Sequence, residues 1–486
     1  RLNTQNPNMI ADSGCTLSRE QVPGCQTCHT PHTSACCRPE TSGIAKKATN
    51  IRLCRKCRDR PAQVVVRQHE PLCSPCLHDS ISAKARSAIR SHALIRPGDT
   101  VVLAYSGGHA SALLLHLLAA MRSLNLKHPE KRKVPFTLHV VHIDERAAHS
   151  ENVEESGPGP SAHAAAVGGY CTDAGVAFHA VPLHAVLLDG GSHSGTEPNT
   201  AAGAGRLRAL LDSVADATAR DDTLRALRTR LLLRTARALG ARSLALGCSS
   251  TRLAAHALAE ACKGRGHGVA AGARLVDARH GPALPFFFRP FRDTSTRELA
   301  ACAHLLALPV PARAPQRYLA GRRGARSINL LAEDFALALL AANPSAASNV
   351  MSVLDRLQAF DWSEAGRAGG VDTQTGRAQD RGTTLCPLCL NPRGPRDGPG
   401  RDGAVPEASR LPVPAAEALA RTCAACRVGV LGLGLGRNHD PDEGTTAALL
   451  GAFAALAAEQ GEEPLADRPA PVPRERMRAA IADCLL

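Results

Sequence analysis

Aromatic side chains and long apolar runs are both scarce in this chain. Phe, Tyr and Trp make up 3% of its 486 residues, and the one tryptophan is Trp362. A core of this composition must be built mainly from Ala, Leu and Val. The longest apolar stretches, residues 112–121 and 445–458, are shorter than the ~18 residues that a membrane-spanning helix needs. The sequence therefore excludes a membrane channel or transporter.

Acidic residues are fewer than basic ones. Asp and Glu number 44 against 58 Lys and Arg, which gives a net charge of +14. A positive field of this size favours an anionic partner, and nucleic acid is the commonest one. The alternative is a coding bias toward arginine, which would give the same balance without any such partner.

Cysteine, in contrast, is abundant, with 18 residues. The chain opens on polar residues with no apolar segment of a secretory signal, so we expect a cytoplasmic protein. In that reducing compartment paired cysteines hold metal more often than they form disulfides. Five Cys-x2-Cys pairs occur, which random scatter does not produce. One of them, Cys25/Cys28, precedes His29 as in c-type haem attachment, but it lies in a polar tail that offers no haem pocket.

Two pairs near the start of the chain have the spacing of a zinc ribbon. Cys54/Cys57 and Cys73/Cys76 are separated by 15 residues. Two turns of this kind present four thiolates, which satisfies the tetrahedral preference of Zn²⁺. Four free thiols would leave so small a segment without enough core to fold. The sequence therefore predicts a structural zinc ion here.

A second quartet is predicted near the other end. Cys386/Cys389 and Cys423/Cys426 are separated by 33 residues, an unusually long interval for one site. Four thiolates suit zinc or an iron–sulfur cluster equally well. We expect shared coordination, with the identity of the metal left open.

Strand-like and helix-like segments alternate through the middle of the chain, which predicts βαβ units. The expected strands are residues 101–105, 136–143, 176–181 and 243–246, and the expected helices are residues 110–118, 162–174, 207–239 and 252–262. The predicted fold class is α/β, with a parallel sheet covered by helices on both faces. Sheets of this kind bind ligands beyond the carboxyl ends of their strands.

Changes in composition divide the chain into five parts. We expect a tail at 1–50, a zinc ribbon with a basic helix at 51–95, and the α/β domain at 96–295, which carries a Gly/Ser-rich insertion near 187–205. A helical region follows at 296–362, with expected helices at 295–306, 330–340 and 346–360. It precedes a flexible Gly/Pro-rich part at 363–486 that holds the closing cysteine pairs and a weak helix.

The first expected strand of the sheet leads into a candidate phosphate-binding loop. Ser106, Gly107, Gly108 and Ser111 stand between that strand and the start of a helix. Glycines let the backbone approach an anion, and the helix N-terminus directs amides and a positive dipole at it. The alternative is an ordinary strand-to-helix turn without a ligand.

This arrangement resembles the PP-loop of the ATP pyrophosphatase (adenine nucleotide alpha hydrolase-like) family, whose usual form is SGGxDS. A ribbon before the loop and a closing set of cysteines narrow the similarity to the tRNA-thiolation branch, and within it to the non-catalytic subunits. The similarity covers residues 51–360 and 385–427. Its main carriers are CRKC and CSPC (54–76), VVLAYSGGHASALLLHLL (101–118), VVHIDE (140–145), the segments 227–254 and 264–268, FRPFRDTSTREL (288–299), and LCPLC with CAAC.

The chain departs from the catalytic members of that branch where chemistry is done. Ala110 stands where the family carries the loop aspartate, a carboxylate suited to Mg²⁺-linked phosphate. The cysteine pair that catalytic members carry before the helix at 229–236 has no counterpart in 222–226, and 309–318 lacks their second cysteine. We expect Cys302 to be a core residue, and Cys248 to be a small buried residue or to approach the loop.

The resemblance implies a partner subunit that is not itself catalytic, and it leaves ATP binding open. A catalytic thiolase subunit would form a heterodimer with it, and the pair would place sulfur on carbon 2 of the wobble uridine in tRNAs for Lys, Glu and Gln. The sulfur would arrive as a thiocarboxylate on a ubiquitin-related modifier. The basic helix around residues 80–94 is the first candidate for contact with tRNA, with a solvated face as the alternative. Arg289, Arg292 and Asp293 are expected to fix the edge of the sheet or to meet the partner.

Two other functions stay open. The chain would be a self-sufficient tRNA sulfurtransferase if Cys248 or the C-terminal cysteines supplied the reactive thiol. It would be a zinc-ribbon RNA-binding scaffold outside thiolation if the loop and the sheet have no part in that reaction.

Overall fold

A computed structural model describes a large part of the chain. The described residues are 52–66, 69–127, 134–149, 162–187, 200–214, 216–280, 284–310, 326–357, 385–391, 419, 422–429 and 450–452. The predicted tail with Cys25/Cys28, residues 188–199 of the insertion, most of the Gly/Pro-rich part and the weak C-terminal helix lie outside them. The domain boundaries stay predictions.

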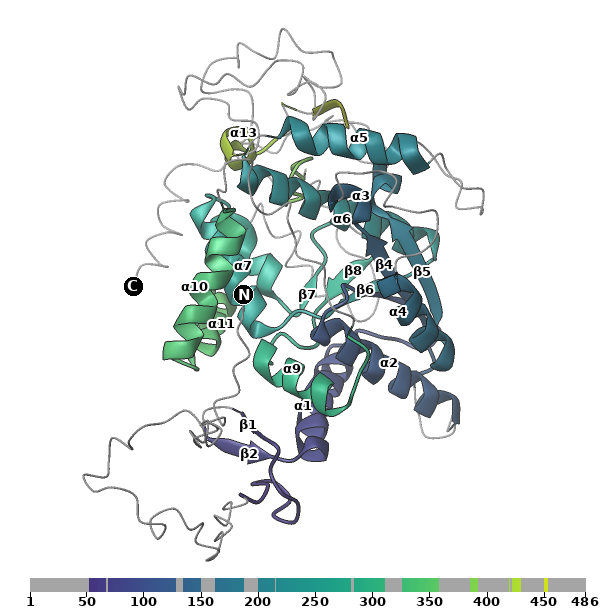
Figure 1. Ribbon diagram of the computed structural model, residues 1–486, viewed down its shortest axis with the longest axis vertical. Helices are drawn as coiled ribbons and strands as arrows, with labels where there is room; N and C mark the ends of the chain where they lie inside the picture. Colours follow the sequence, from purple (N-terminus) through teal and green to yellow (C-terminus); the bar gives the residue numbers. More distant parts are fainter. Residues whose placement is uncertain are drawn as a thin grey trace, which may run out of the picture. The chain divides into compact units, whose positions relative to one another are not determined.

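Six strands form the central sheet in the order β5-β4-β3-β6-β8-β7 (Figure 1). Their bounds are β3 Thr100–Ala104, β4 Thr137–Asp144, β5 Ala177–Pro182, β6 Ser243–Leu246, β7 Val276–Asp277 and β8 Phe286–Phe288. Five of them pair in parallel, which confirms the predicted α/β class, whereas β7 pairs with β8 antiparallel. The sequence analysis missed β7 and β8 because runs of two and three residues carry no usable period.

The central strand β3 shows why the sheet is covered on both faces. Val101 and Leu103 belong to the core cluster that α1, α2 and α9 complete, whereas Val102 joins Leu233 of α6 and Leu244 of β6 in another. Because successive side chains of a strand point to opposite faces, these clusters lie on opposite sides of the sheet. A strand buried on both faces is apolar throughout, as parallel strands usually are.

The helices follow the predicted positions with one split. Their bounds are α1 Ser74–Ser91, α2 His109–Lys127, α3 Arg146–His149, α4 Ala162–Asp173, α5 Thr200–Ser213, α6 Ala217–Ala238, α7 Ser250–Cys262, α8 Val269–Ala273, α9 Thr296–Leu305, α10 Ile328–Ala342, α11 Ala346–Arg356 and α13 Ala424–Gly429, with 3-10 turns η3 Leu183–Leu187 and η4 Gly266–Gly268. The helical region predicted at 207–239 is present but divided in two, since Asp216 caps a new helix by accepting a hydrogen bond from the amide of Ala219. Residues 200–205, predicted as insertion, are the first turns of α5.

The ribbon at the start of the described chain packs onto the same core as the sheet. Antiparallel β1 (Val64–Val66) and β2 (Glu70–Leu72) lead into α1, which begins at Ser74 rather than near residue 80. Cys54, Leu77 and Ile81 are buried in the cluster that holds Val101. The ribbon is thereby fixed to the face of the sheet that α2 and α9 cover.

No single helix of the described residues has both the length and the apolar character to cross a bilayer. The bent pair α10 and α11 meets that criterion only when the two helices are taken together. Both pack against α7, beside which Figure 1 shows them.

Candidate functional site

The N-terminal cysteine quartet is assembled from a turn and a helix start. Cys54 and Cys57 lie on a turn closed by the amide of Arg58, which donates to the Cys54 carbonyl at 2.8 Å. Cys73 is the N-cap residue of α1, and Cys76 lies in its first turn. All four sulfur atoms lie within 4.8 Å of one another, as the spacing predicted.

The C-terminal quartet is built in the same way, from a turn and a helix start. The fold brings its two cysteine pairs together although 33 residues separate them in the sequence. The amide of Leu390 donates to the Cys386 carbonyl at 2.9 Å and closes the turn that carries Cys386 and Cys389. Cys423 directly precedes α13, and Cys426 lies in that helix. The four sulfur atoms again lie within 4.8 Å of one another.

The sulfur spacing fits a tetrahedral metal centre. A tetrahedron with metal–sulfur bonds of about 2.3 Å has sulfur atoms about 3.8 Å apart. The Cys57 and Cys73 sulfur atoms are 3.9 Å apart, and those of Cys389 and Cys423 are 3.8 Å apart. Each quartet can therefore hold a metal ion or a cluster.

The thiols of the N-terminal quartet ionise unequally by themselves. Burial opposes ionisation of Cys54, but the amides of Cys57, Cys73 and Lys56 outweigh it and lower the pKa of Cys54 to about 6. Burial and the neighbouring thiols raise the pKa of Cys76 to about 12. A bound cation resolves this conflict because it binds all four groups as thiolates.

The candidate phosphate loop connects β3 to α2. Gly107 adopts a φ of +80°, a left-handed conformation that favours glycine. The Ser111 hydroxyl donates to the Gly108 carbonyl at 2.8 Å and lies 3.5 Å from the Ser106 hydroxyl. Ser106 is exposed, so the loop at the N-terminus of α2 is open to solvent.

A second strand end supports this loop from behind. A Cβ atom added at Gly247, just after β6, would lie 2.8 Å from the Ser111 amide nitrogen and 2.9 Å from the Ala110 carbonyl carbon. Only a residue without a side chain fits between the strand end and the loop. The end of β6 and the first turn of α2 thus lie in close backbone contact at the carboxyl edge of the sheet, where parallel sheets bind their ligands.

Acidic groups near the loop are engaged by arginines. At the end of β4 the Arg146 guanidinium donates to Asp144 at 2.8 Å, and Arg228 of α6 pairs with Glu145. Ala110 offers no carboxylate. Within the described residues, the carboxylates at this strand end already have cationic partners.

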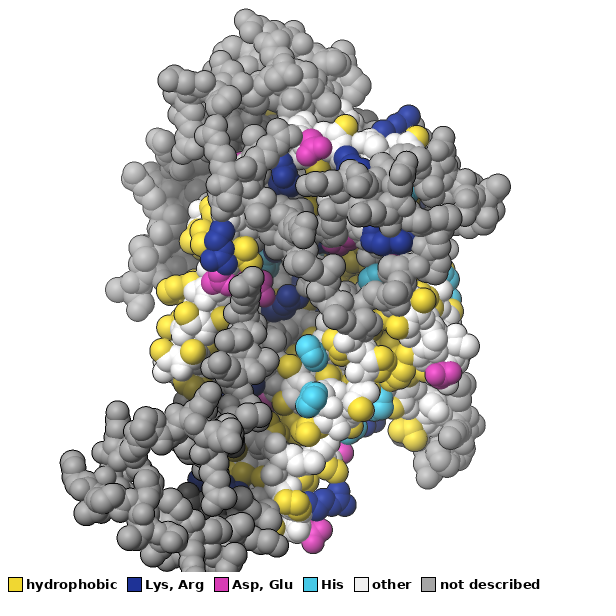
Figure 2. Space-filling view, in the orientation of Figure 1, with side chains coloured by type: hydrophobic (Ala, Val, Ile, Leu, Met, Phe, Trp, Pro, Cys, Tyr) yellow, Lys and Arg dark blue, Asp and Glu magenta, His cyan; other side chains and the backbone are white. Residues whose placement is uncertain are grey.

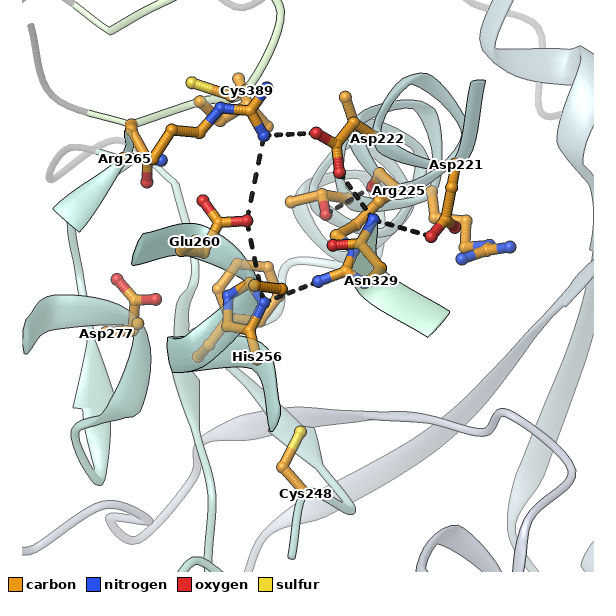
Figure 3. A pocket seen from close by; sticks show the side chains of 18 of the residues that line it. Asp221, Asp222, Arg225, Cys248, His256, Glu260, Arg265, Asp277, Asn329 and Cys389 are labelled. Atoms are coloured by element: carbon orange, nitrogen blue, oxygen red, sulfur yellow. Dashed lines mark hydrogen bonds and ion pairs between the residues drawn. The ribbon is translucent and has the colours of Figure 1, made fainter. Parts of the chain in front are cut away.

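Beyond the end of β6 lies a cavity of about 470 Å³, a size usual for small-molecule sites. Cys248 is half-buried and lines this cavity, and Figure 3 shows its sulfur directed toward His256. The Arg225 guanidinium donates to His256 Nδ1 at 2.7 Å. Burial and this neighbouring charge lower the pKa of His256 to about 3.

The stretch that catalytic members were expected to use for cysteines holds an ion-pair network. Asp222 lies inside α6, rather than before a helix, and accepts from Lys263 at 2.8 Å. It also accepts from Arg265 at 2.5 Å, a pair that Figure 3 shows. Asn329 of α10 donates to the same carboxylate at 2.9 Å. Burial opposes ionisation of Asp222, but the two cations outweigh it and lower its pKa to about 2. The Asp222 carboxylate in this part of the cavity is therefore already paired with two cations.

A second buried network joins the sheet edge to the C-terminal cysteines. Asp277 of β7 accepts from Arg279 at 2.8 Å and from Arg289 at 3.0 Å. Burial opposes ionisation of Asp277, but these guanidinium groups hold its pKa well below the usual range. Arg279 also donates to Asn391, and Arg230 donates to the Pro387 carbonyl at 2.5 Å. The C-terminal turn is therefore anchored in the core.

Several sequence predictions for single residues can be compared with these contacts. Arg289 fixes the sheet edge as expected, and Cys302 is a core residue with 1% exposure. No sequence motif predicts the cavity or the role of Asp277, although the two-residue spacing of Asp277 and Arg279 is a usable sign of a local ion pair. Arg292 pairs with Asp355 of α11 at 2.5 Å.

Curated proteins of one name match this chain, whereas no family model does. "Cytoplasmic tRNA 2-thiolation protein 2" of Oryza sativa subsp. indica is 29% identical over 358 residues, which cover 70% of this chain and 72% of the relative. The proteins of that name from Homo sapiens (26% over 66% and 70%) and Arabidopsis thaliana (30% over 59% and 59%) agree. The chain is thus similar to proteins named cytoplasmic tRNA 2-thiolation protein 2 from plants and mammals.

Among solved structures, the U34-tRNA thiolase NcsA from Methanococcus maripaludis with its [4Fe-4S] cluster is similar at a TM-score of 0.44 and 16% identity. The match covers 63% of this chain and 89% of that chain. A similarity at this level does not establish a shared activity. The similarity to the cytoplasmic tRNA 2-thiolation proteins rests on the sequence relatives alone.

Proposed function

We propose that this chain takes part in the 2-thiolation of the wobble uridine in tRNA as the non-catalytic partner of a catalytic PP-loop thiolase. The names of its relatives give the reaction. The observation that supports the partner role is a phosphate loop whose backbone is complete while Ala110 occupies the place of its aspartate. The target tRNAs would be those for Lys, Glu and Gln, where the product is 5-methoxycarbonylmethyl-2-thiouridine.

In this proposal the catalytic partner does the chemistry. It would activate the C2 oxygen of the uridine with ATP, and a thiocarboxylated ubiquitin-related modifier would deliver the sulfur. The present chain would supply surface for tRNA and for the partner. The Asp222 ion pairs support this division of labour. The stretch in which catalytic members carry a reactive cysteine pair here holds a carboxylate that Lys263 and Arg265 already bind, so it offers neither a thiol nor a free base.

The two cysteine quartets would have structural roles. We assign zinc to Cys54, Cys57, Cys73 and Cys76. For Cys386, Cys389, Cys423 and Cys426, zinc and an iron–sulfur cluster suit the donors equally, and visible absorption after anaerobic purification distinguishes them. When bound, the metal supplies a cross-link between a turn and a helix start.

Affinity capture from cells tests the partner role. The full chain should co-purify with a PP-loop homologue and with tRNA, both identified by mass spectrometry. Cells lacking the chain should lose 2-thiouridine. Normal 2-thiouridine levels in those cells would contradict the proposal and favour an RNA-binding scaffold outside thiolation.

A self-sufficient sulfurtransferase is the second candidate, because Cys248 lines the cavity next to the loop. The purified chain with ATP, Mg²⁺ and tRNA should form no adenylate if the partner role is right. Thiolation by the isolated chain when sulfide is added as the sulfur donor, lost in Cys248→Ser, would establish the alternative.

A further inference from the structure

The two cysteine turns have the same backbone and opposite surroundings. In each, the residue after the second cysteine has a left-handed backbone: φ is +58° at Arg58 and +59° at Leu390. Each of these residues donates its amide to the first cysteine's carbonyl. In the C-terminal turn the side chains of Leu388 and Leu390 are 4% and 3% exposed, so they are packed in the core. The equivalent side chains of the N-terminal turn are exposed.

Arg58 occupies a position that would suit glycine. A non-glycine residue at positive φ is strained by about 1 kcal/mol relative to glycine. At Leu390 the burial of the side chain compensates for this strain. Arg58 gains no such burial, and within the described residues no carboxylate pairs with it. The side chain is therefore not explained by the fold.

Basic residues are concentrated around this position. The segment 52–60 has five exposed basic side chains and one acidic one, which is Asp59. The five are Arg52, Arg55, Lys56, Arg58 and Arg60. The one ion pair among the described contacts of this group joins Arg55 to Glu70 at 4.0 Å, and Arg55 remains 68% exposed. An exposed pair of this length contributes little.

The cysteines do not account for these charges. The pKa of the Cys57 thiol is lowered chiefly by the backbone amides of Asp59 and Arg60. The amides that stabilise a thiolate in this turn would be present with any side chains. Three cations on the turn, Arg55, Lys56 and Arg58, thus face solvent, and among the described residues only Arg55 has a carboxylate partner, the exposed pair with Glu70 at 4.0 Å.

We propose that this turn, which we call the basic knuckle (Arg55, Lys56 and Arg58), binds the phosphate backbone of RNA. The inference rests on the proposed function, which makes tRNA a partner. Exposed arginine and lysine side chains contact phosphates irrespective of base sequence. Residues 52–66 contain no aromatic side chain that would stack on a base or anchor a protein interface. Phosphate is the ligand that this chemistry fits.

Titration of a fluorescent, unmodified transcript of tRNA-Lys (UUU anticodon) with the full chain tests the proposal. The variant R55Q/K56Q/R58Q should bind at least about tenfold more weakly. The slope of log affinity against log salt concentration should become smaller by roughly two to three, since each phosphate contact adds about 0.7–0.9 to it. The control R237Q/R297Q/R356Q removes the same charge from exposed positions on α6, α9 and α11 and should keep the wild-type affinity within about twofold.

Metal content and melting temperature distinguish lost contact from lost fold. The single variant R58G keeps the turn and removes its backbone strain, so it should melt no lower than the wild type while binding the transcript several-fold more weakly. If the triple variant loses its metal, the RNA affinity of R58G still tests the proposal.

Three results would overturn the proposal: unchanged affinity and salt dependence in both knuckle variants, equal losses in the control, or loss of a co-purifying protein with RNA binding intact. The last result would make the knuckle a protein-binding surface. The 2-thiouridine content of cells lacking the whole chain tests the proposed function separately, because that measurement does not depend on where the RNA binds.

Discussion

At the scale of single residues, buried ionisable groups around the cavity govern how the fold responds to pH. His256 accepts a hydrogen bond from Arg225 and is half-buried beside that cation, and this burial together with the neighbouring charge lowers the pKa of His256 to about 3. Burial also lowers the pKa of His280 to about 4. Both rings are therefore neutral in the folded state wherever the pH is above these values.

Acid should destabilise the fold from near neutrality. Unfolded histidines bind protons below about pH 6.5, so the unfolded state holds more protons than the folded state between about pH 6.5 and pH 3. The free energy of unfolding should fall with pH in that window, by up to about 1.4 kcal/mol per pH unit for each such histidine. Urea unfolding at several pH values measures this slope. His256→Asn should make it shallower, whereas the exposed control His92→Asn should leave it unchanged.

Asp277 is the second such residue. Its carboxylate forms ion pairs with both Arg279 and Arg289 in the protein interior. Asp277→Asn would leave two buried guanidinium groups without an anion and should lower the free energy of unfolding by about 3–5 kcal/mol. Urea unfolding again provides the measurement. Asp293→Asn is the matched control, because the Asp293 side chain is 67% exposed. Equal effects of the two substitutions would contradict this explanation.

At the scale of elements, the sequence predicted those segments whose signals are local. Apolar periodicity located β3 and α2, and cysteine spacing located the ribbon. It did not locate the break between α5 and α6, because the apolar pattern continues across it and only the cap at Asp216 marks it. The short strands β7 and β8 depend on pairing with each other and with β6, which is a tertiary interaction.

Substitution of the cysteines in the two turns should lower the melting temperature to different extents. The wild-type chain should contain two metal centres, and each of C54S/C57S and C386S/C389S should remove one of them, as measured by elemental analysis. The C-terminal variant should also lower the melting temperature more, because its turn accepts a hydrogen bond from Arg230 and Asn391 contacts Arg279. A larger loss of stability in C54S/C57S would contradict this assignment.

At the scale of the whole molecule, apolar exposure is concentrated in one region. Of nine exposed large hydrophobic side chains among the described residues, six lie in 331–357, on or next to α10 and α11. Figure 2 shows apolar side chains gathered there. Patches of this kind promote self-association of an isolated protein.

Replacing part of that region should improve solubility at no cost in stability. Leu331 and Phe335 lie one turn apart on α10 and are 49% and 59% exposed. The variant L331K/F335K should show less concentration-dependent light scattering and an unchanged melting temperature. A melting temperature several degrees lower would mean that these side chains are packed in the folded protein.

The candidate site as a whole was only partly predictable. The phosphate loop and both quartets follow from motifs with fixed spacing. The cavity is built by α6, α7, α10, the sheet edge and the C-terminal turn, and no motif joins elements so far apart in the sequence. Its charge network arises from side chains such as Asp222 and Arg265 that carry no local signal.

The tight fit of Gly247 behind the phosphate loop offers a genetic tool. A methyl group there would collide with the backbone at Ala110 and Ser111 and force the loop out of position. Gly247→Ala would disturb this one feature without altering a charge, a thiol or an exposed surface. Cells that carry only this allele would report, through their 2-thiouridine content, whether the shape of a loop that has lost its acidic residue still matters to the organism.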